Sequence, residues 1–192
     1  NERLAIVGAN GTGKTTLLRA IAGLFKPLEG TIKLGVGIDS AFFDQEHTDL
    51  QLDESPINMT YRVLADATEQ SVRDTLGAFG FSGLAVDKHI GTLSGGERTR
   101  LSLMKVVLSG ANLLMLDEPT NHLDIEAIDA MRNSLTDYDG TLILVSHDRD
   151  FLTSVCNRFL VLGDKPKLIT GANAFEDYIA SRGGIVKPHA KQ

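Results

Sequence analysis

Cysteine is almost absent from this chain, and its scarcity excludes disulfide-stabilised secreted domains. Cys156 is the only cysteine among the 192 residues, so no internal disulfide can form. It lies in an apolar run with Phe151, Leu152 and Val155, and no neighbouring motif suggests a nucleophile. We therefore expect a core or near-surface thiol in a protein of a reducing compartment.

Long apolar runs, a signal peptide and an initiator methionine are also lacking. No stretch approaches the roughly 18 consecutive apolar residues of a membrane-spanning helix, and no signal peptide precedes the first apolar segment. The chain opens at Asn1, so we expect that something upstream was removed or never included. These absences predict a soluble, cytoplasmic protein that does not insert into a membrane.

Composition indicates one globular domain. Hydrophobic residues make up 42% and charged residues 23% of the chain, without a disorder-prone bias. The formal net charge of −6 argues against a broad surface for nucleic acids or membranes, although a local basic patch remains compatible with it.

Hydrophobic periodicity predicts an α/β domain with a mostly parallel sheet. Apolar strand 3–7, a glycine-rich turn and a helix from Thr15 follow one another. Nearly continuous apolar runs at 112–117 and 141–146 are typical of strands buried on both faces, and a helix around 125–135 connects them. The other predicted elements are strands at 31–35 and 37–45, two helices within 57–81, a helix that starts at the glycines near 95 and ends at 110, a closing hairpin at 158–163 and 166–171, and a last helix at 174–182. We expect a domain over 1–182 with a helical subdomain at about 50–110, followed by a mobile tail or linker at 183–192.

The first glycine-rich stretch, GANGTGKT at 8–15, has the pattern of a phosphate-binding loop in its required context between a strand and a helix. Its glycines let backbone N–H groups converge on phosphates, and the helix N-terminus adds positive potential. Lys14 would reach the β and γ phosphates and Thr15 would ligate Mg²⁺. An exposed lysine in an ordinary glycine turn is the alternative.

Two acids end the buried run LLMLDEP. Carboxylates are costly at such a position unless they serve a metal or a reaction. Asp117 can hold Mg²⁺ through water, and Glu118 can orient or deprotonate an attacking water. Alternatively, the pair merely caps the next helix.

His147 and Gln45 are predicted at the same edge of the sheet as Asp117 if the strands are parallel. A neutral imidazole at His147 could hydrogen-bond a γ phosphate, and the Gln45 amide could help to hold Mg²⁺ and water. Each is weak alone, because a lone His or Gln at a strand end is usually a capping or surface residue. The phosphate loop and the acid pair make the combination persuasive.

The order of phosphate loop, Gln45, LSGGE at 93–97, LLMLDEPTNHLD and SHD resembles the nucleotide-binding domain of the ATP-binding cassette (ABC) superfamily over nearly the full chain. The resemblance implies a P-loop NTPase of ABC type whose N-terminal strands are missing, with ATP and Mg²⁺ as cofactors and ATP hydrolysis as the activity. It assigns catalysis to Glu118, His147 and Gln45, and metal binding to Thr15, Gln45 and Asp117. The nucleotide-binding residues that it implies are Gly8, Asn10, Gly11, Gly13, Lys14, Thr15, Thr16, Ser94, Gly95, Gly96 and Asp124.

The resemblance also implies why one small domain carries two glycine-rich loops. In this family, the signature of one module, here Ser94 to Gly96, faces the phosphate loop of a second module in a head-to-tail dimer with two ATP molecules between them. The chemistry of the loop fits this arrangement, because Ser94 and the N–H groups at the start of the following helix can form a second phosphate cap. We therefore expect a second ABC module as partner.

Finer features resemble the ABC-F proteins, which carry two modules in one soluble chain and act on ribosomes, some of them conferring antibiotic resistance. These features are DEPTNHLD, LSGGERTRLSL and VSHDRDFL, and the short spacing between Gln45 and LSGGE resembles the second module. The resemblance implies ribosome or rRNA contact through other parts of a full-length protein. The upstream aromatic that stacks on adenine in this family is absent, so weak base selectivity is expected.

Two other functions remain open from the sequence. The chain could be the ATPase subunit of a membrane transporter, or a truncated nucleotide-binding module without turnover. NHLD and SHDRDF favour the ABC-F reading over the transporter.

Overall fold

The computed structural model describes residues 2–44, 50–121 and 123–181, and its strands form one six-stranded sheet of order β2-β3-β4-β1-β5-β6. The parallel pairs are β3 with β4, β4 with β1 and β1 with β5, whereas β6 is antiparallel to β5. This topology confirms the predicted α/β fold, the mostly parallel sheet and the closing hairpin. The strands are β1 (Arg3–Val7), β2 (Ser40–Asp44), β3 (Leu113–Asp117), β4 (Thr141–Val145), β5 (Arg158–Val161) and β6 (Lys167–Thr170).

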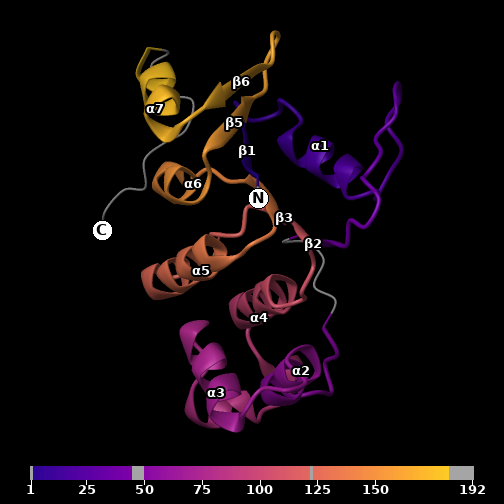
Figure 1. Ribbon diagram of the computed structural model, residues 1–192. Helices are drawn as coiled ribbons and strands as arrows, with labels where there is room; N and C mark the ends of the chain where they lie inside the picture. Colours follow the sequence, from indigo (N-terminus) through magenta and orange to yellow (C-terminus); the bar gives the residue numbers. More distant parts are fainter. Residues whose placement is uncertain (1, 45–49, 122, 182–192) are drawn as a thin grey trace. The chain divides into compact units, whose positions relative to one another are not determined.

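Seven α-helices are present in the described ranges (Figure 1). They are α1 (Lys14–Ile21), α2 (Pro56–Val63), α3 (Glu69–Ala78), α4 (Gly95–Val107), α5 (Ile125–Asp137), α6 (Arg149–Val155) and α7 (Ala172–Ser181). Two 3₁₀ turns, Gly83–Val86 and Ile90–Thr92, lie between α3 and α4. The predicted helices are therefore confirmed, and α4 begins at the glycines as expected, but α6 was not predicted.

The chain divides into two compact units, each of which is described by itself. The first comprises residues 1–42, 111–119 and 139–192 and contains β1, β3 to β6, α1, α6 and α7. The second comprises residues 43–110 and 120–138 and holds α2 to α5. The predicted limits of the domain and of its helical subdomain stay predictions, and the predicted tail at 183–192 lies outside the described residues.

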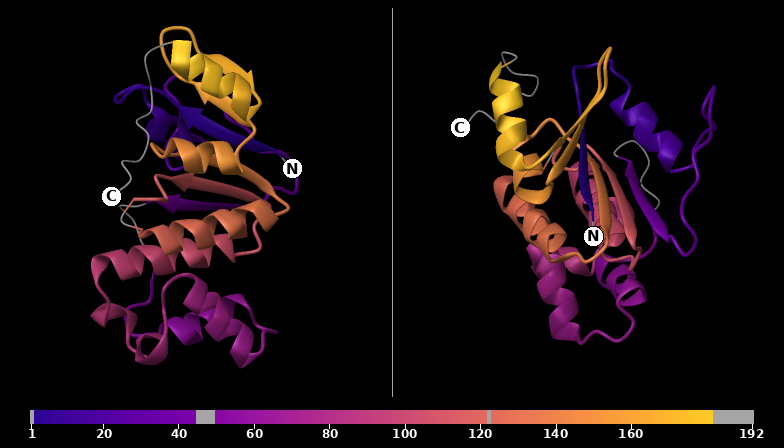
Figure 2. Two further views of the ribbon diagram at one scale, coloured as in Figure 1. Left: turned by 90° about the vertical axis from the view of Figure 1, so that its left-hand side faces the viewer. Right: turned by 45° about the horizontal axis from the view of Figure 1, so that its top comes forward.

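Both faces of the sheet in the first unit are covered by helices, as Figure 2 shows. On one face Leu18 of α1 packs among Ile6, Met115 and Val145, all of them buried. On the other face Phe175 of α7 stacks on Phe159 of β5 with ring centroids 4.1 Å apart. Burial on two sides explains the almost purely apolar sequence of β3, whose five residues are all buried.

The predicted strand at 31–35 is wrong, because these residues have irregular backbone without a ladder partner in the described chain. Alternating apolar residues give β propensity, but a strand also needs a neighbour for its N–H and C=O groups. The segment from 24 to 38 instead exposes a series of large apolar side chains. They are Leu24, Phe25, Leu28, Ile32, Leu34, Val36 and Ile38.

The predicted core position of Cys156 is confirmed, since the residue is buried after α6 with 4% of its surface exposed, whereas the reducing compartment stays a prediction. Burial raises the pKa of its thiol to about 12, so the thiol stays protonated at neutral pH. Within the described ranges, the chain has no helix with the length and apolar character that crossing a bilayer requires.

Candidate functional site

The phosphate loop joins β1 to α1 in a conformation that depends on glycine. A Cβ at Gly8 would lie 2.9 Å from the carbonyl oxygen of Leu162, so no larger residue fits without displacing backbone. Gly13, which precedes α1, has φ of 87° in the left-handed region, where a side chain is strained. The loop therefore brings its backbone close to whatever occupies it.

Helix α1 begins without a side-chain cap, because its N-cap residue is Gly13. The first N–H groups of a helix have no partner within the helix, and here no side chain accepts a hydrogen bond at the cap position. Asn10, Gly11 and Thr16 are exposed beside this helix start. The helix N-terminus is thus open to an anion.

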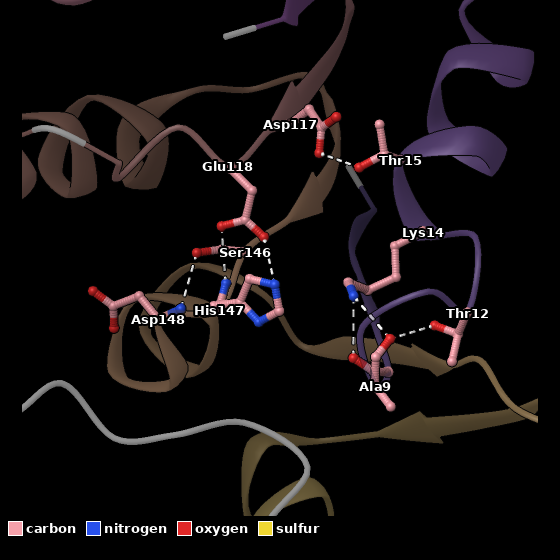
Figure 3. Close-up of polar contacts among 10 residues, drawn as sticks. Ala9, Thr12, Lys14, Thr15, Asp117, Glu118, Ser146, His147 and Asp148 are labelled. Atoms are coloured by element: carbon pink, nitrogen blue, oxygen red, sulfur yellow. Dashed lines mark hydrogen bonds and ion pairs between the residues drawn. The ribbon is translucent and has the colours of Figure 1, made fainter. Parts of the chain in front are cut away.

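Lys14 lies back over the loop that it follows (Figure 3). Its Nζ donates hydrogen bonds to the carbonyl oxygens of Gly8 and Ala9, each at 3.2 Å, and only 8% of the residue is exposed. Thr12 Oγ1 also donates to Ala9 O, at 2.9 Å. The cation is therefore held at the loop by neutral carbonyl groups.

A hydroxyl and a carboxylate from distant parts of the chain meet beside the loop. Thr15 Oγ1 on α1 donates to Asp117 Oδ1 at the end of β3, at a distance of 3.1 Å. Asp117 is 5% exposed. The structure thus brings together the two predicted metal-ligating residues that lie within its described ranges, whereas the third, Gln45, lies outside them.

Glu118 has the backbone of a strained position. Its φ is 48°, and it is the only non-glycine residue with positive φ among those that the structure describes. Its N–H donates to Val145 O at 2.8 Å, which holds this conformation against β4. Such backbone costs on the order of 1–3 kcal/mol and is found where function requires it. The turn directs the carboxylate along the edge where β3 and β4 end.

His147 and Glu118 contact each other through backbone and side chain (Figure 3). His147 N donates to Glu118 Oε2 at 3.1 Å, and His147 Nε2 lies 3.3 Å from Oε1. Oε1 is buried and accepts no hydrogen bond of good geometry from any described residue. Burial raises the pKa of the Glu118 carboxyl, while the His147 charge and the backbone hydrogen bond from His147 oppose that rise.

Ser146 and Asp148 fix the turn around His147 through hydrogen bonds. The sequence analysis did not identify either residue as part of the site. Ser146, 1% exposed, accepts a hydrogen bond at Oγ from Asp148 N at 3.0 Å. Asp148 caps α6 by accepting from Phe151 N at 3.0 Å. The pattern of an Asp before a short apolar run signals this cap and could have predicted α6.

The LSGGE stretch, hereafter the signature loop, belongs to the second unit and begins α4 with a reciprocal cap. Ser94 Oγ accepts from Glu97 N at 3.3 Å, and Ser94 N donates to Glu97 Oε2 at 2.7 Å. These hydrogen bonds lower the pKa of Glu97, so it stays ionised at neutral pH. The S-x-x-E spacing is the sequence signal for this capping box.

Asp124 lies at the start of α5 in the same unit. Its Oδ1 accepts from Ala127 N at 2.9 Å, which caps the helix, and its Oδ2 lies 3.9 Å from Arg100 NH1. The Arg100 guanidinium in turn lies over the Phe81 ring, 5.8 Å from its centroid. α4, which carries the signature loop, is thereby connected to the start of α5.

Comparison with known proteins identifies the family. A family model described as ABC transporter matches residues 1–121, which is more than half of the chain. The chain belongs to the ABC transporter family. This ABC domain is 41% identical over 178 residues to "Probable ATP-binding protein YheS" of Haemophilus influenzae, covering 92% of this chain and 28% of the relative. It is 38% identical over 165 residues to ABC transporter F family member 5 of Arabidopsis thaliana, covering 85% of this chain and 24% of the relative.

Solved structures agree with this assignment. RNase-L Inhibitor matches with a TM-score of 0.76 and 26% identity, covering 95% of this chain and 37% of that one. The archaeal ribosome recycling factor aABCE1, solved in complex with the ribosomal stalk protein aP1, matches with a TM-score of 0.77, also at 26% identity, with 95% and 37% coverage. The sequence relationship to an F family member confirms the resemblance to ABC-F proteins. The likeness to a second module stays a prediction. The ABC domain spans about a quarter of the length of these curated relatives.

Proposed function

We propose that this ABC domain binds Mg-ATP and hydrolyses it at sites shared with a second ABC module. The observation that carries the proposal is the meeting of Lys14, the Thr15–Asp117 pair and the Glu118–His147 pair in one compact unit. They come from the phosphate loop and from the carboxyl ends of β3 and β4, the edge where parallel sheets bind ligands.

The residues present fit a triphosphate with its magnesium ion. Uncapped N–H groups at the start of α1 and the Lys14 ammonium would hold the phosphates. Thr15 Oγ1 and Asp117, already within hydrogen-bond distance, supply the oxygen ligands that Mg²⁺ prefers, and Gln45 would add a third. The described residues contain no cluster of three or more His, Cys, Asp or Glu side chains for an all-protein metal cage, which suits an ion that shares its ligands with phosphate and water. Held by Thr15 and Asp117, Mg²⁺ would supply positive charge that offsets the negative charge developing on the phosphate oxygens.

Hydrolysis would use the acid and the histidine at the strand ends. Glu118 would accept a proton from water that attacks the γ phosphorus, and its buried Oε1 is the oxygen without a hydrogen bond among the described residues. His147, half exposed, would hydrogen-bond the γ phosphate from the adjacent turn.

The second unit would act on the nucleotide of a partner module. Ser94 caps α4 and Gly95 and Gly96 open it, so the Ser94 hydroxyl and the N–H groups of the two glycines can cap a γ phosphate presented from outside. Asp124 would support this contact through the ion pair that joins the start of α5 to Arg100 of α4. ATP then holds two modules together, and its hydrolysis releases them.

The relatives support a role in translation. We assign the module to a cytoplasmic ABC-F protein that acts on ribosomes, with rRNA or ribosomal proteins as partners of other parts of the full-length protein, and antibiotic resistance as one form of that role. The support is the relationship to an F family member and the structural likeness to an archaeal ribosome recycling factor. A transporter subunit and a module without turnover are the competing outcomes.

The test combines phosphate release with ribosome binding. Mg²⁺-dependent phosphate release is measured across protein concentration, because a shared site predicts a specific rate that rises as modules pair. A specific rate that stays constant in a demonstrated monomer contradicts the shared site, and absent turnover in a paired protein supports the module without activity.

Co-sedimentation of the full-length protein with ribosomes, with and without a nonhydrolysable ATP analogue, tests the role in translation, whereas co-purification with a membrane subunit would favour the transporter.

A further inference from the structure

A fork-shaped ion pair joins the turn of His147 to the last helix. Arg149, the first residue of α6, donates from Nε to Oε1 of Glu176 on α7 at 2.8 Å, and its NH2 group pairs with Oε2 of the same carboxylate. The side chains are 24% and 36% exposed. Two parallel N–H to oxygen contacts fix orientation as well as distance.

Nothing within α6 itself favours a positively charged residue at the position of Arg149. A cation in the first turn of a helix faces the positive end of the helix dipole, where acidic side chains are favoured. Asp148 and Asp150, on either side of Arg149, follow that preference. Arg149 does not, and its contact with Glu176 supplies the compensating charge from another element.

The partner residue lies on a helix that is firmly attached to the sheet. Phe175, next to Glu176, is fully buried and stacks on Phe159 of β5, and Ile179 one turn further is 1% exposed. The start of α7 is joined to the chain before β5 by a hydrogen bond from Gly171 N to Asn157 O at 2.7 Å. Arg149 is therefore held by a carboxylate whose own backbone has little freedom.

Only one residue, Asp148, separates this anchor from His147 of the site. His147 N contacts Glu118 Oε2, Asp148 N contacts Ser146 Oγ, and Arg149 contacts Glu176, so each of three successive residues is held by a contact outside itself. Ser146 and β4 secure one end of the turn, and the arginine fork secures the other. A shift at Arg149 would move His147 relative to the Glu118 carboxylate.

We propose that Arg149 and Glu176 form a positioning pair, which acts through His147 and makes the docking of α7 a determinant of the rate of ATP hydrolysis. The proposal rests on the proposed function, since it concerns the hydrolytic step at the same site. It predicts that the pair affects kcat more than KM for ATP, because neither residue belongs to the phosphate loop.

The experiment compares Arg149→Gln, Glu176→Gln and the charge exchange that combines Arg149→Glu with Glu176→Arg. Phosphate release by the paired modules should show kcat lowered about two- to fivefold in each single variant, the size that a partly exposed ion pair can account for, with KM and melting temperature nearly unchanged. The charge exchange should recover most of the lost kcat. Arg158→Gln is the matched control, because Arg158 pairs with Glu2 in the same unit, away from the His147 turn, and should keep the parental kcat.

The outcomes separate this inference from the proposed function. A parent without Mg²⁺-dependent turnover contradicts the proposed function itself. An active parent whose Arg149→Gln and Glu176→Gln variants keep kcat overturns only the positioning pair. So does a charge exchange that stays folded but as slow as the single variants, or a loss of rate that merely follows the fraction unfolded in thermal melts of the same samples.

Discussion

The phosphate loop and the signature loop each lead into the N-terminus of a helix, α1 and α4 respectively. The two helix starts differ in whether side chains accept hydrogen bonds from their backbone N–H groups. At α1 the N-cap is a glycine and no side chain accepts a hydrogen bond there. At α4 the Ser94 hydroxyl and the Glu97 carboxylate cap each other's backbone. The first helix start is therefore open to a ligand, whereas two backbone N–H groups at the second are already engaged by its own side chains.

This difference suggests that the two loops bind phosphate in different settings, one within a single module and the other between modules. An open helix start with a resident lysine can hold phosphates within one module. A self-capped start with an ionised Glu97 gains little from an anion on its own, because two of its N–H groups are engaged and a negative charge lies next to them. It can still donate the Ser94 hydroxyl proton to a phosphate that another module presents. The following predictions test the comparison, from the largest expected effect to the smallest.

Glu118→Gln should slow turnover by about 10²- to 10⁴-fold, because the amide keeps the hydrogen-bonding reach of the carboxylate but cannot accept a proton from water. Binding through the open loop should survive, so ATP should hold paired modules together. Single-turnover phosphate release and size-exclusion chromatography with light scattering, each with and without Mg-ATP, measure the two effects. Turnover close to the parental rate would remove Glu118 from the chemistry.

Lys14→Ala should weaken Mg-ATP binding by about ten- to hundredfold, since a charged hydrogen bond to phosphate contributes roughly 1.5–3 kcal/mol. Fluorescence titration of a nucleotide analogue with the single module measures it. The control is Lys165→Ala, which removes a charge of the same sign between β5 and β6. Unchanged affinity in Lys14→Ala would contradict the assignment of the first loop.

Ser94→Asp should leave ATP binding to a single module unchanged but weaken ATP-driven pairing by about tenfold or more, because the added charge would face the γ phosphate of the partner module. Aspartate is itself a good N-cap, so α4 should still form. Ser94→Asn, neutral and also a good cap, is the matched control and should pair better than Ser94→Asp. If Ser94→Asp lowered the affinity of the single module for ATP, the signature loop would share the nucleotide of Lys14.

Glu97→Gln should strengthen ATP-driven pairing by a few-fold, because glutamine can keep the capping box while removing the negative charge beside it. The parent should also show a pH dependence that the variant lacks. The folded pKa of Glu97 is lowered, so its stabilising contribution is present above about pH 4.3, the ordinary value for Glu, and is lost as pH falls through the folded pKa. Thermal melts of both proteins between neutral and acidic pH check this, and parallel curves would contradict it.

The sequence predicted those parts of the site that depend on chain order. The phosphate loop, the acids after β3 and His147 after β4 follow apolar runs, and parallel strands bring such ends to one edge. The contacts between their side chains were not predictable in the same way. The positive φ of Glu118 and its hydrogen bond from His147 N arise only when β3 and β4 are paired in register.

Local sequence patterns predicted an element correctly only where that element does not depend on a neighbouring strand or helix. The apolar alternation at 31–35 predicted a strand, but a ladder needs a neighbouring strand, which local propensity cannot supply. α6 was missed although Asp148 marks its start, because seven residues give too little periodicity to see. The fork between Arg149 and Glu176 joins elements that are separated by a hairpin, so only the folded chain reveals it.

The exposed apolar side chains of the 24–38 segment have a consequence for solubility. Leu28 and Val36 are fully exposed, and an exposed segment with alternating apolar side chains has the sequence character of an aggregation site. Purified protein should therefore self-associate without nucleotide as its concentration rises. Val36→Lys, which places a gatekeeper charge near the end of the segment, should raise the solubility limit and leave Mg-ATP binding intact.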